Sequence, residues 1–299
     1  MWFKNARVYR LQQQDSIRLD QLEAQLEEQA FTPCGKSEQK RVGWVSALGK
    51  HGEMLSHVVG ATALLAMKSQ ERVLPAGVVN ELLSEKVAEI EAEEHRKVYK
   101  KEKTQIKDEL VLELTPRAFC RSKWVTGYID LAAGWIVIDA SSASAAEDFL
   151  GLLRESLGTL SVVPWSTQQT PSETLTHWLT HGVEGKFELG TEAELVSRAI
   201  DGGSAKIKDQ PLFGDEIEVL LDAGKRVKKL ALIWDERIKF IVDEELALKR
   251  IKLTDVYEDA VELSQSDDVA AQLDHEFVLM TGVFREWLSA VVEAMGGLN

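Results

Sequence analysis

The sequence has few cysteines and no hydrophobic run long enough to cross a membrane. Cys34 and Cys120 are the only cysteines in 299 residues, too few for a disulfide framework and without the partner spacing of a metal site. The longest apolar run, residues 58–67, falls far short of the ~20 residues that a membrane helix needs. The N-terminus also lacks the apolar core of a signal peptide. We therefore expect a soluble, cytoplasmic protein with two reduced thiols and no membrane partner.

Sequence motifs for catalysis are missing as well. Residues 151–158 lack the Lys-Ser/Thr pair that would follow a phosphate-binding loop. His177 and His181 are four residues apart, but no glutamate lies between them as a general base. We therefore expect no enzyme, no cofactor and no resident metal. Asp130 and Asp139 are expected to face each other across a hairpin, so a metal-dependent nuclease remains an alternative.

What the sequence does contain is segregated charge. The formal net charge is -14, with 35 Lys+Arg against 49 Asp+Glu. The basic residues nevertheless gather in clusters, whereas residues 255–299 contain ten acids against Arg285 alone. Such a chain can attract a polyanion at one surface and repel it elsewhere. Nucleic acid is the first partner that we expect, and an acidic protein-interaction scaffold without DNA binding is the alternative.

The candidate DNA contacts are the clustered cations and one aromatic residue between cations. They are Lys4, Arg7, Arg96, Lys97, Lys100, Lys101, Arg117, Phe119, Arg121, Lys123, Lys206, Lys208, Lys225, Arg226, Lys228, Lys229, Lys239, Lys249 and Arg250. Cations that contact phosphates bind in a salt-sensitive way that ignores base sequence. Phe119 can stack on a base or wedge into a base step, and a core position is its alternative.

The order of expected elements indicates an α+β fold of mixed strands and helices, because the two alternate irregularly. Residues 76–114 favour helix and have a polar middle, which predicts one long central helix that is docked at its ends or leaves the body as an arm. A capping pattern at residues 191–194 predicts a further helix. Residues 226–234, 237–242 and 246–253 predict a three-stranded meander, with Lys228, Lys239 and Lys249 on its outer face.

We expect three regions. Residues 1–165 form a central α+β region that contains the long helix 76–114. Residues 166–225 form a smaller helical tip, and residues 226–299 form the β-meander with the C-terminal helices.

Short segments spread in order along the chain carry a family resemblance. They are MWFKNARVYRL (1–11), FTPCG (31–35), GWV (43–45), LTPRAFCR (114–121), EDFLGLLRESLG (147–158), VVP (162–164) and FVLMTG (277–282). Together they resemble the RdgC family of recombination-associated proteins. The resemblance implies a non-enzymatic, nucleoid-associated protein that encircles double-stranded DNA as a ring-shaped homodimer and limits RecA-mediated recombination. Single-stranded DNA is a further candidate ligand.

A ring of two subunits requires two separate contacts between them, each made by the same surface of both copies. We expect one at the C-terminal helix, through Phe284, Trp287 and Leu288. The other is expected near Leu212 and Phe213. The ring would place positive residues around its central hole.

Overall fold

The computed structural model describes residues 2–183, 185–197, 199, 202–262 and 268–299, and it confirms the expected α+β class. The strands are β1 Asn5–Leu11, β2 Lys40–Val45, β3 Ser56–Val59, β4 Thr62–Val73, β5 Phe119–Asp130, β6 Trp135–Ile138, β7 Val162–Pro164, β8 Phe187–Ser197, β9 Ser204–Ile207, β10 Lys225–Trp234, β11 Ile238–Asp243 and β12 Leu248–Leu253. The helices are α1 Leu19–Glu27, α2 Ala76–Glu94, α3 Lys100–Leu114, α4 Ala143–Leu157, α5 Pro171–His181, α6 Asp215–Asp222, α7 Asp255–Glu262 and α8 Val269–Ala294. Among these described helices, none is both long and apolar enough to cross a membrane.

The strands join one antiparallel sheet in the order β2-β4-β5-β6-β1-β12-β11-β10-β8-β9, with β3 beside β4 and β7 beside β1. Strand β1 connects the two halves of this sheet. Its first residues pair with β12, Asn5 opposite Lys249, and its later residues pair with β6, Arg7 opposite Ile138. Side chains alternate between the two faces of a strand, so Asn5 and Arg7 lie on one face and the buried Ala6 lies on the other.

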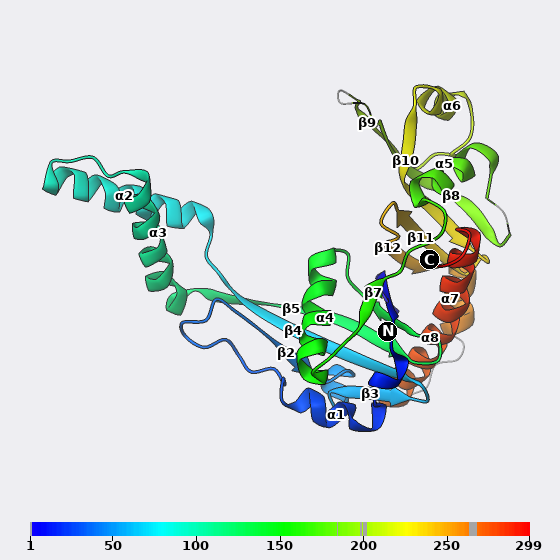
Figure 1. The fold of residues 1–299 in the computed structure, drawn as a ribbon, viewed down its shortest axis with the longest axis horizontal. Coiled ribbons are helices and arrows are strands. Elements are labelled where there is room, and N and C mark those ends of the chain that lie inside the picture. Colours follow the sequence, from blue (N-terminus) through cyan, green and yellow to red (C-terminus); the bar gives the residue numbers. More distant parts are fainter. Residues whose placement is uncertain (1, 184, 198, 200–201, 263–267) are drawn as a thin grey trace.

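Helix α8 covers one face of both halves of the sheet (Figure 1). Phe277 contacts Tyr128 of β5 with ring centroids 6.1 Å apart, and Trp287 contacts Phe240 of β11 at 4.8 Å. The apolar stripe of this helix therefore spans the junction and holds the halves together. Helix α5 packs beside it, with Leu175 fully buried in the same core.

The burial of α8 corrects the expected dimer contacts. Phe284, Trp287 and Leu288 are completely buried by their own chain, and Leu212 is 1% exposed. None of these side chains offers a surface to a second copy. Phe213 differs, because 79% of it is exposed just before α6.

Helices α1 and α4 cover the opposite face of the N-terminal half of the sheet. Trp44 and Phe149 meet there edge to face, with ring centroids 5.2 Å apart. Gly127 of β5 allows this approach, because a Cβ at that position would lie 2.8 Å from Cζ of Phe149. On the C-terminal half, the corresponding face of β8–β12 carries exposed or half-buried side chains instead.

The long hairpin of β4 and β5 carries α2 and α3 away from the sheet as an arm (Figure 1). The two strands pair from Thr62 opposite Asp130 to Val73 opposite Phe119. The expected single helix over 76–114 is wrong, because the chain turns back at His95, whose φ of 51° is left-handed. The reason is a small core inside the arm, made by Val87, Val98, Ile106 and Leu110.

The helix expected after residue 191 is also wrong, because β8 runs through this segment. Ala193 and Leu195 are buried while Glu192 and Glu194 point to the other face, which is strand periodicity. The meander is confirmed as β10, β11 and β12. The division into three regions stays a prediction. Strands from all three expected regions belong to the same sheet.

Candidate nucleic-acid interface

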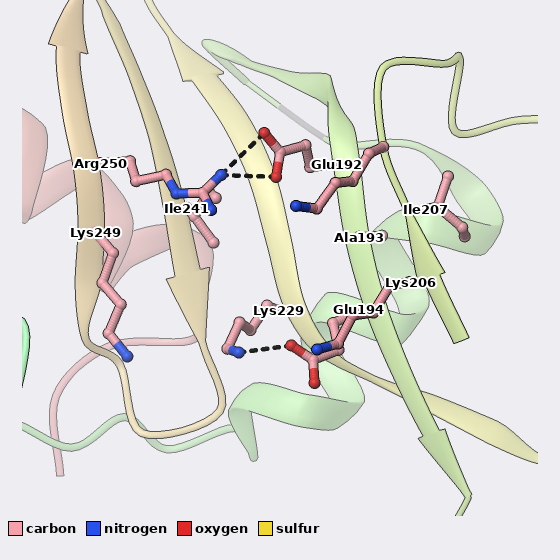
Figure 2. Close-up of a pocket in the computed structure, with 10 residues that line it drawn as sticks. Glu192, Ala193, Glu194, Lys206, Ile207, Lys229, Ile241, Lys249 and Arg250 are labelled. Atoms are coloured by element: carbon pink, nitrogen blue, oxygen red, sulfur yellow. Dashed lines mark hydrogen bonds and ion pairs between the residues drawn. The ribbon is translucent and has the colours of Figure 1, made fainter. Parts of the chain in front are cut away.

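The open face of β8–β12 gathers basic side chains from β9, β10 and β12 and from Lys208, which directly follows β9. We call it the basic face. Its centre is a shallow pocket of about 240 Å³ (Figure 2). The charged residues that line it are Lys206, Lys208, Lys229, Lys249, Arg250, Glu192 and Glu194. The alternation of each strand explains this placement, since the side chains that point the other way form the core under α5 and α8.

Three ion pairs hold the cations of the basic face in place. Nζ of Lys229 lies 2.5 Å from Glu194 on the neighbouring strand, and Nη1 of Arg250 lies 2.8 Å from Glu192 (Figure 2). Lys249 contacts the buried Asp243 at 2.7 Å. The hydrogen bond from Lys229 holds the pKa of Glu194 below its usual value, so this carboxylate stays ionised.

The basic face has more positive than negative charge. Five cations line the pocket, against Glu192, Glu194 and the nearby Asp243. Lys206 and Lys208 form no ion pair with the part of the chain that the structure describes. A surface with unpaired ammonium groups beside fixed ion pairs attracts phosphates through the free charges.

The basic face continues onto neighbouring strands. Arg7 of β1 lies on the same side as Lys249 and approaches Glu245 at 3.4 Å. Lys239 of β11 extends the face toward its other end and lies 3.7 Å from Asp255. Lys4 is exposed just before β1. Arg7 and Lys239 therefore lie on the same face as the pocket, whereas the position of Lys4 alternates to the other face of β1.

A bulge in β10 brings a second lysine to its outer side. The pairing with β8 shifts between Val227 and Lys229, so Lys229 joins the expected Lys228 between the buried Val227 and Leu230. Lys228 contacts Glu244 at 3.7 Å. Arg226 is exposed, and Lys225 donates to the carbonyl of Gly203 at 2.7 Å.

A second group of expected residues lies at the base of the arm. Phe119 is 89% exposed, so the alternative of a core position is wrong. Arg117 is exposed beside it. Arg121 and Lys123 both contact Glu71, at 2.6 and 3.3 Å, and these contacts lower the pKa of that carboxyl. The group of Arg121, Lys123 and Glu71 therefore has a net charge of about +1.

The third group lies at the end of the arm. Arg96 pairs with both Glu94 and Glu102, which raises the pKa of its guanidinium further. Lys97, Lys100 and Lys101 are exposed. The expected basic residues thus form three separate groups along the molecule, and the group on β8–β12 brings five cations to one pocket.

The structure adds residues that were not among the expected DNA contacts. Lys103 and Lys107 join Lys100 along one side of α3, beside Tyr99, which is 75% exposed. Their spacing of three and four residues was the available signal. At the base of the arm, Trp124 is 60% exposed, and Nζ of Lys68 lies 5.2 Å from its ring.

The two aspartates considered for a nuclease do not face each other. Asp130 pairs with Trp135 across the hairpin and accepts hydrogen bonds from Arg285, whereas Asp139 accepts the backbone N–H of Asn5 at 2.8 Å. His177 and His181 stack with centroids 4.4 Å apart. Within the described ranges, no three histidine, cysteine or acidic side chains gather as a potential metal site.

The fold is thus that of an antiparallel α+β protein with a helical arm and an open basic sheet face. A family model described as "Putative exonuclease, RdgC" matches residues 1–298. The chain is 43% identical over 298 residues to the recombination-associated protein RdgC of Psychromonas ingrahamii, covering 99% of both chains. It is 41% identical over 298 residues to the protein of the same name from Yersinia pestis, covering 99% of this chain and 98% of the relative. The chain belongs to the RdgC family, and it is a relative of recombination-associated proteins.

Proposed function

We propose that this protein binds double-stranded DNA without sequence preference through the basic face of β8–β12. The observation that carries the proposal is the convergence of Lys206, Lys208, Lys229, Lys249 and Arg250 on one open sheet surface. Flexible ammonium groups on a broad surface suit the phosphate backbone, which has the same charge in every sequence. Single-stranded DNA presents the same phosphates and is a secondary ligand.

We further propose that the protein acts as a homodimer that encloses DNA and associates with the nucleoid. The arm and the β8–β9 end both rise from the same side of the body, which gives one chain the outline of an open arc (Figure 1). Two arcs joined end to end by a two-fold axis would close a ring with two symmetric contacts. Phe213, near one end of the arc, is the expected dimer residue that remains exposed.

Enclosure of DNA would limit RecA-mediated recombination, because a protein closed around a duplex obstructs the advance of a filament along it. The support for this role is the name of the relatives, which are recombination-associated proteins. Enclosure also explains how a chain with a net charge of -14 keeps hold of a polyanion. A modest local attraction would guide the DNA, and topology would retain it.

The test of DNA binding replaces three lysines of the basic face together, as Lys206→Gln, Lys229→Gln and Lys249→Gln. Each phosphate contact contributes about 0.9 to the slope of log affinity against log salt. We expect the triple variant to reduce that slope by roughly 2 to 3 and to bind DNA at least tenfold more weakly at low salt. The matched control carries Lys36→Gln, Lys50→Gln and Lys186→Gln, which remove the same charge elsewhere. Equal affinities for the two triple variants would contradict the proposal.

The test of enclosure compares linear duplex, nicked circular duplex and linear duplex with blocked ends. A closed ring slides off free ends, so we expect rapid loss from linear DNA in high salt and retention on the other two. Equal retention on all three DNAs would contradict enclosure, but it would leave the proposal that DNA binds to the basic face intact. A complete lack of DNA binding would favour the scaffold alternative.

The family description also makes exonuclease activity a second candidate. End-labelled duplex incubated with Mg²⁺ or Mn²⁺ would lose label if the chain is an exonuclease. Activity that disappears in Asp130→Asn or Asp139→Asn protein, while folding is preserved, would assign it to this chain. We propose a binding role, because each of these aspartates holds a structural contact.

A further inference from the structure

The two cysteines of the chain are 86 residues apart in sequence but lie against the same short stretch of β4. The backbone N–H of Cys34 donates to Oε1 of Gln70 at 2.8 Å, and its Sγ lies 3.2 Å from the carbonyl oxygen of Gln70. Cys120 is the residue of β5 directly opposite Arg72. Gln70 contacts Cys34, and Arg72 lies opposite Cys120. Because Gln70 and Arg72 are only two residues apart on β4, the two cysteines lie over neighbouring positions of this strand.

Both thiols also belong to the same face of the β4–β5 hairpin. Side chains of residues that face each other in an antiparallel pair lie on one side, as do those of residues i and i+2. Cys120 therefore shares a face with the side chains of Arg72 and Gln70. The segment around Cys34 lies across that face, because Gln70 bonds Cys34 and the guanidinium of Arg72 bonds the carbonyl of Gly35 at 3.1 Å.

The segment that carries Cys34 is fixed close to the sheet. The N–H of Phe31 donates to the carbonyl of Trp44 at 2.8 Å. Gly43 has no side chain, and a Cβ there would lie 2.5 Å from Cα of Phe31. On the other side, Arg72 donates to the carbonyl of Ala118 at 2.9 Å, two residues before Cys120. One arginine thus ties together the surroundings of both thiols.

The thiols differ in accessibility, which suits a two-step exchange. Cys120 is exposed, whereas Cys34 is half-buried. Burial raises the pKa of the Cys34 thiol, and a charge on Cys120 raises it further, which is consistent with the two sulfurs being neighbours. The exposed sulfur is available to solution reagents, and the sheltered one reacts with a partner held beside it.

We propose that Cys34 and Cys120 form a reversible disulfide when the protein meets a small oxidised disulfide such as oxidised glutathione. The thiolate of Cys120 attacks one sulfur of the reagent and displaces a glutathione thiolate, which leaves a mixed disulfide. The thiolate of Cys34 then attacks Sγ of Cys120 and displaces the second glutathione thiolate. The two leaving thiolates take up the two thiol protons, and the reagent receives the two electrons lost by the protein.

The disulfide would fasten the segment before β2 to β5 at the base of the arm, one residue from the exposed Phe119. Disulfides in proteins of reducing compartments are mostly transient and redox-sensing, and a bond beside an exposed surface residue fits that pattern.

The test treats the full-length protein with oxidised glutathione and determines the products by intact mass and peptide mapping. We expect a species two mass units lighter that joins the peptides of Cys34 and Cys120 and reverts with dithiothreitol. Cys34→Ser protein is expected to stop at the mixed disulfide on Cys120. The matched control combines Cys120→Ser with Arg121→Cys, which moves the thiol by one residue to the other face of the hairpin and is expected to leave Cys34 uncrosslinked.

Three results would overturn the proposal. One is a wild-type product that stops with glutathione on Cys120. Another is a disulfide between the Cys120 residues of two chains, and the third is a crosslink in the Arg121→Cys control as fast as in the wild type. The rate of thiol modification in the reduced proteins checks that the variants fold. In each folded protein that contains Cys34, this half-buried thiol should react more slowly than an exposed cysteine.

Discussion

Arg285 of α8 donates two hydrogen bonds to one oxygen of Asp130 at the end of β5, at 3.0 Å from Nε and 2.8 Å from Nη2. Asp130 is 2% exposed, whereas the Arg285 side chain is 45% exposed. The other carboxylate oxygen accepts the N–H of Ala133 and fixes the turn into β6. This pair therefore links the C-terminal helix to the N-terminal half of the sheet.

We expect Arg285→Met to lower the free energy of unfolding by about 2 to 4 kcal/mol, because it leaves a buried carboxylate without its cation. Methionine retains most of the aliphatic packing of Arg285, so the lost stability is due to the missing charge. Urea unfolding measures the free energy of unfolding of both proteins. The control is Arg18→Met, which removes an exposed pair with Asp20 and is expected to cause no measurable change. Similar losses in both variants would contradict this account.

Glu194→Gln is expected to strengthen DNA binding, since it removes a negative charge that offsets Lys229 on the basic face. The expected gain in affinity at low salt is about fivefold, on the order of 1 kcal/mol. Filter binding or fluorescence anisotropy measures it. Glu28→Gln removes the same charge from an exposed position on the other half of the chain and should leave affinity nearly unchanged.

The pH dependence of stability provides a second measurement on Glu194. Its pKa is lowered in the folded chain, so its contribution to stability is present above the unfolded value of about 4.3 and disappears as pH falls through the folded value. Wild type should exceed Glu194→Gln in unfolding free energy at pH 7, and the two should converge once the pH has fallen below the folded pKa of Glu194. A difference that does not change with pH would assign the stabilisation to packing rather than charge.

The variants Trp287→Ala and Phe213→Ala distinguish a loss of folding stability from a loss of association between two copies of the chain. Trp287 is completely buried, so its loss should cost about 3 to 5 kcal/mol of folding free energy. Phe213→Ala should leave the unfolding temperature of the monomer unchanged and weaken the proposed homodimer, as measured by analytical ultracentrifugation. Loss of the dimer in a folded Trp287→Ala protein, with no loss of stability, would contradict the burial of this helix.

His95→Gly is expected to stabilise the arm locally by about 0.5 to 1 kcal/mol. Histidine in a left-handed conformation is strained by about 1 kcal/mol, and glycine removes that strain at some cost in chain entropy. Amide hydrogen exchange in α2 and α3 measures the effect. Faster exchange in these helices would show that the turn depends on the histidine side chain.

The sequence predicted well those elements whose own pattern decides their structure. The meander of β10, β11 and β12 alternates apolar and polar residues, so its local preference and its final packing agree. The same agreement made the C-terminal helix recognisable before its partners were known.

The elements that sequence reasoning missed depend on distant partners. Residues 191–194 carry a helix-capping pattern, but pairing with β10 and β9 makes them part of a strand. The arm has no proline at its turn, and only the packing of Ile106 and Leu110 against Val87 shows why the helix divides. The bulge after Val227 likewise brings Lys229 to the pocket of the basic face, and no local signal marks it.

Strand β1 has a consequence for the synthesis of this chain. It leaves the ribosome before the other described strands, yet Asn5 and Ala6 acquire their β12 partners more than 240 residues later. Its other partners, β6 and β7, also follow long after it. A nascent chain therefore carries an unpaired apolar strand edge for most of its translation, and closure of the sheet is a slow, late event that chaperones would have to protect.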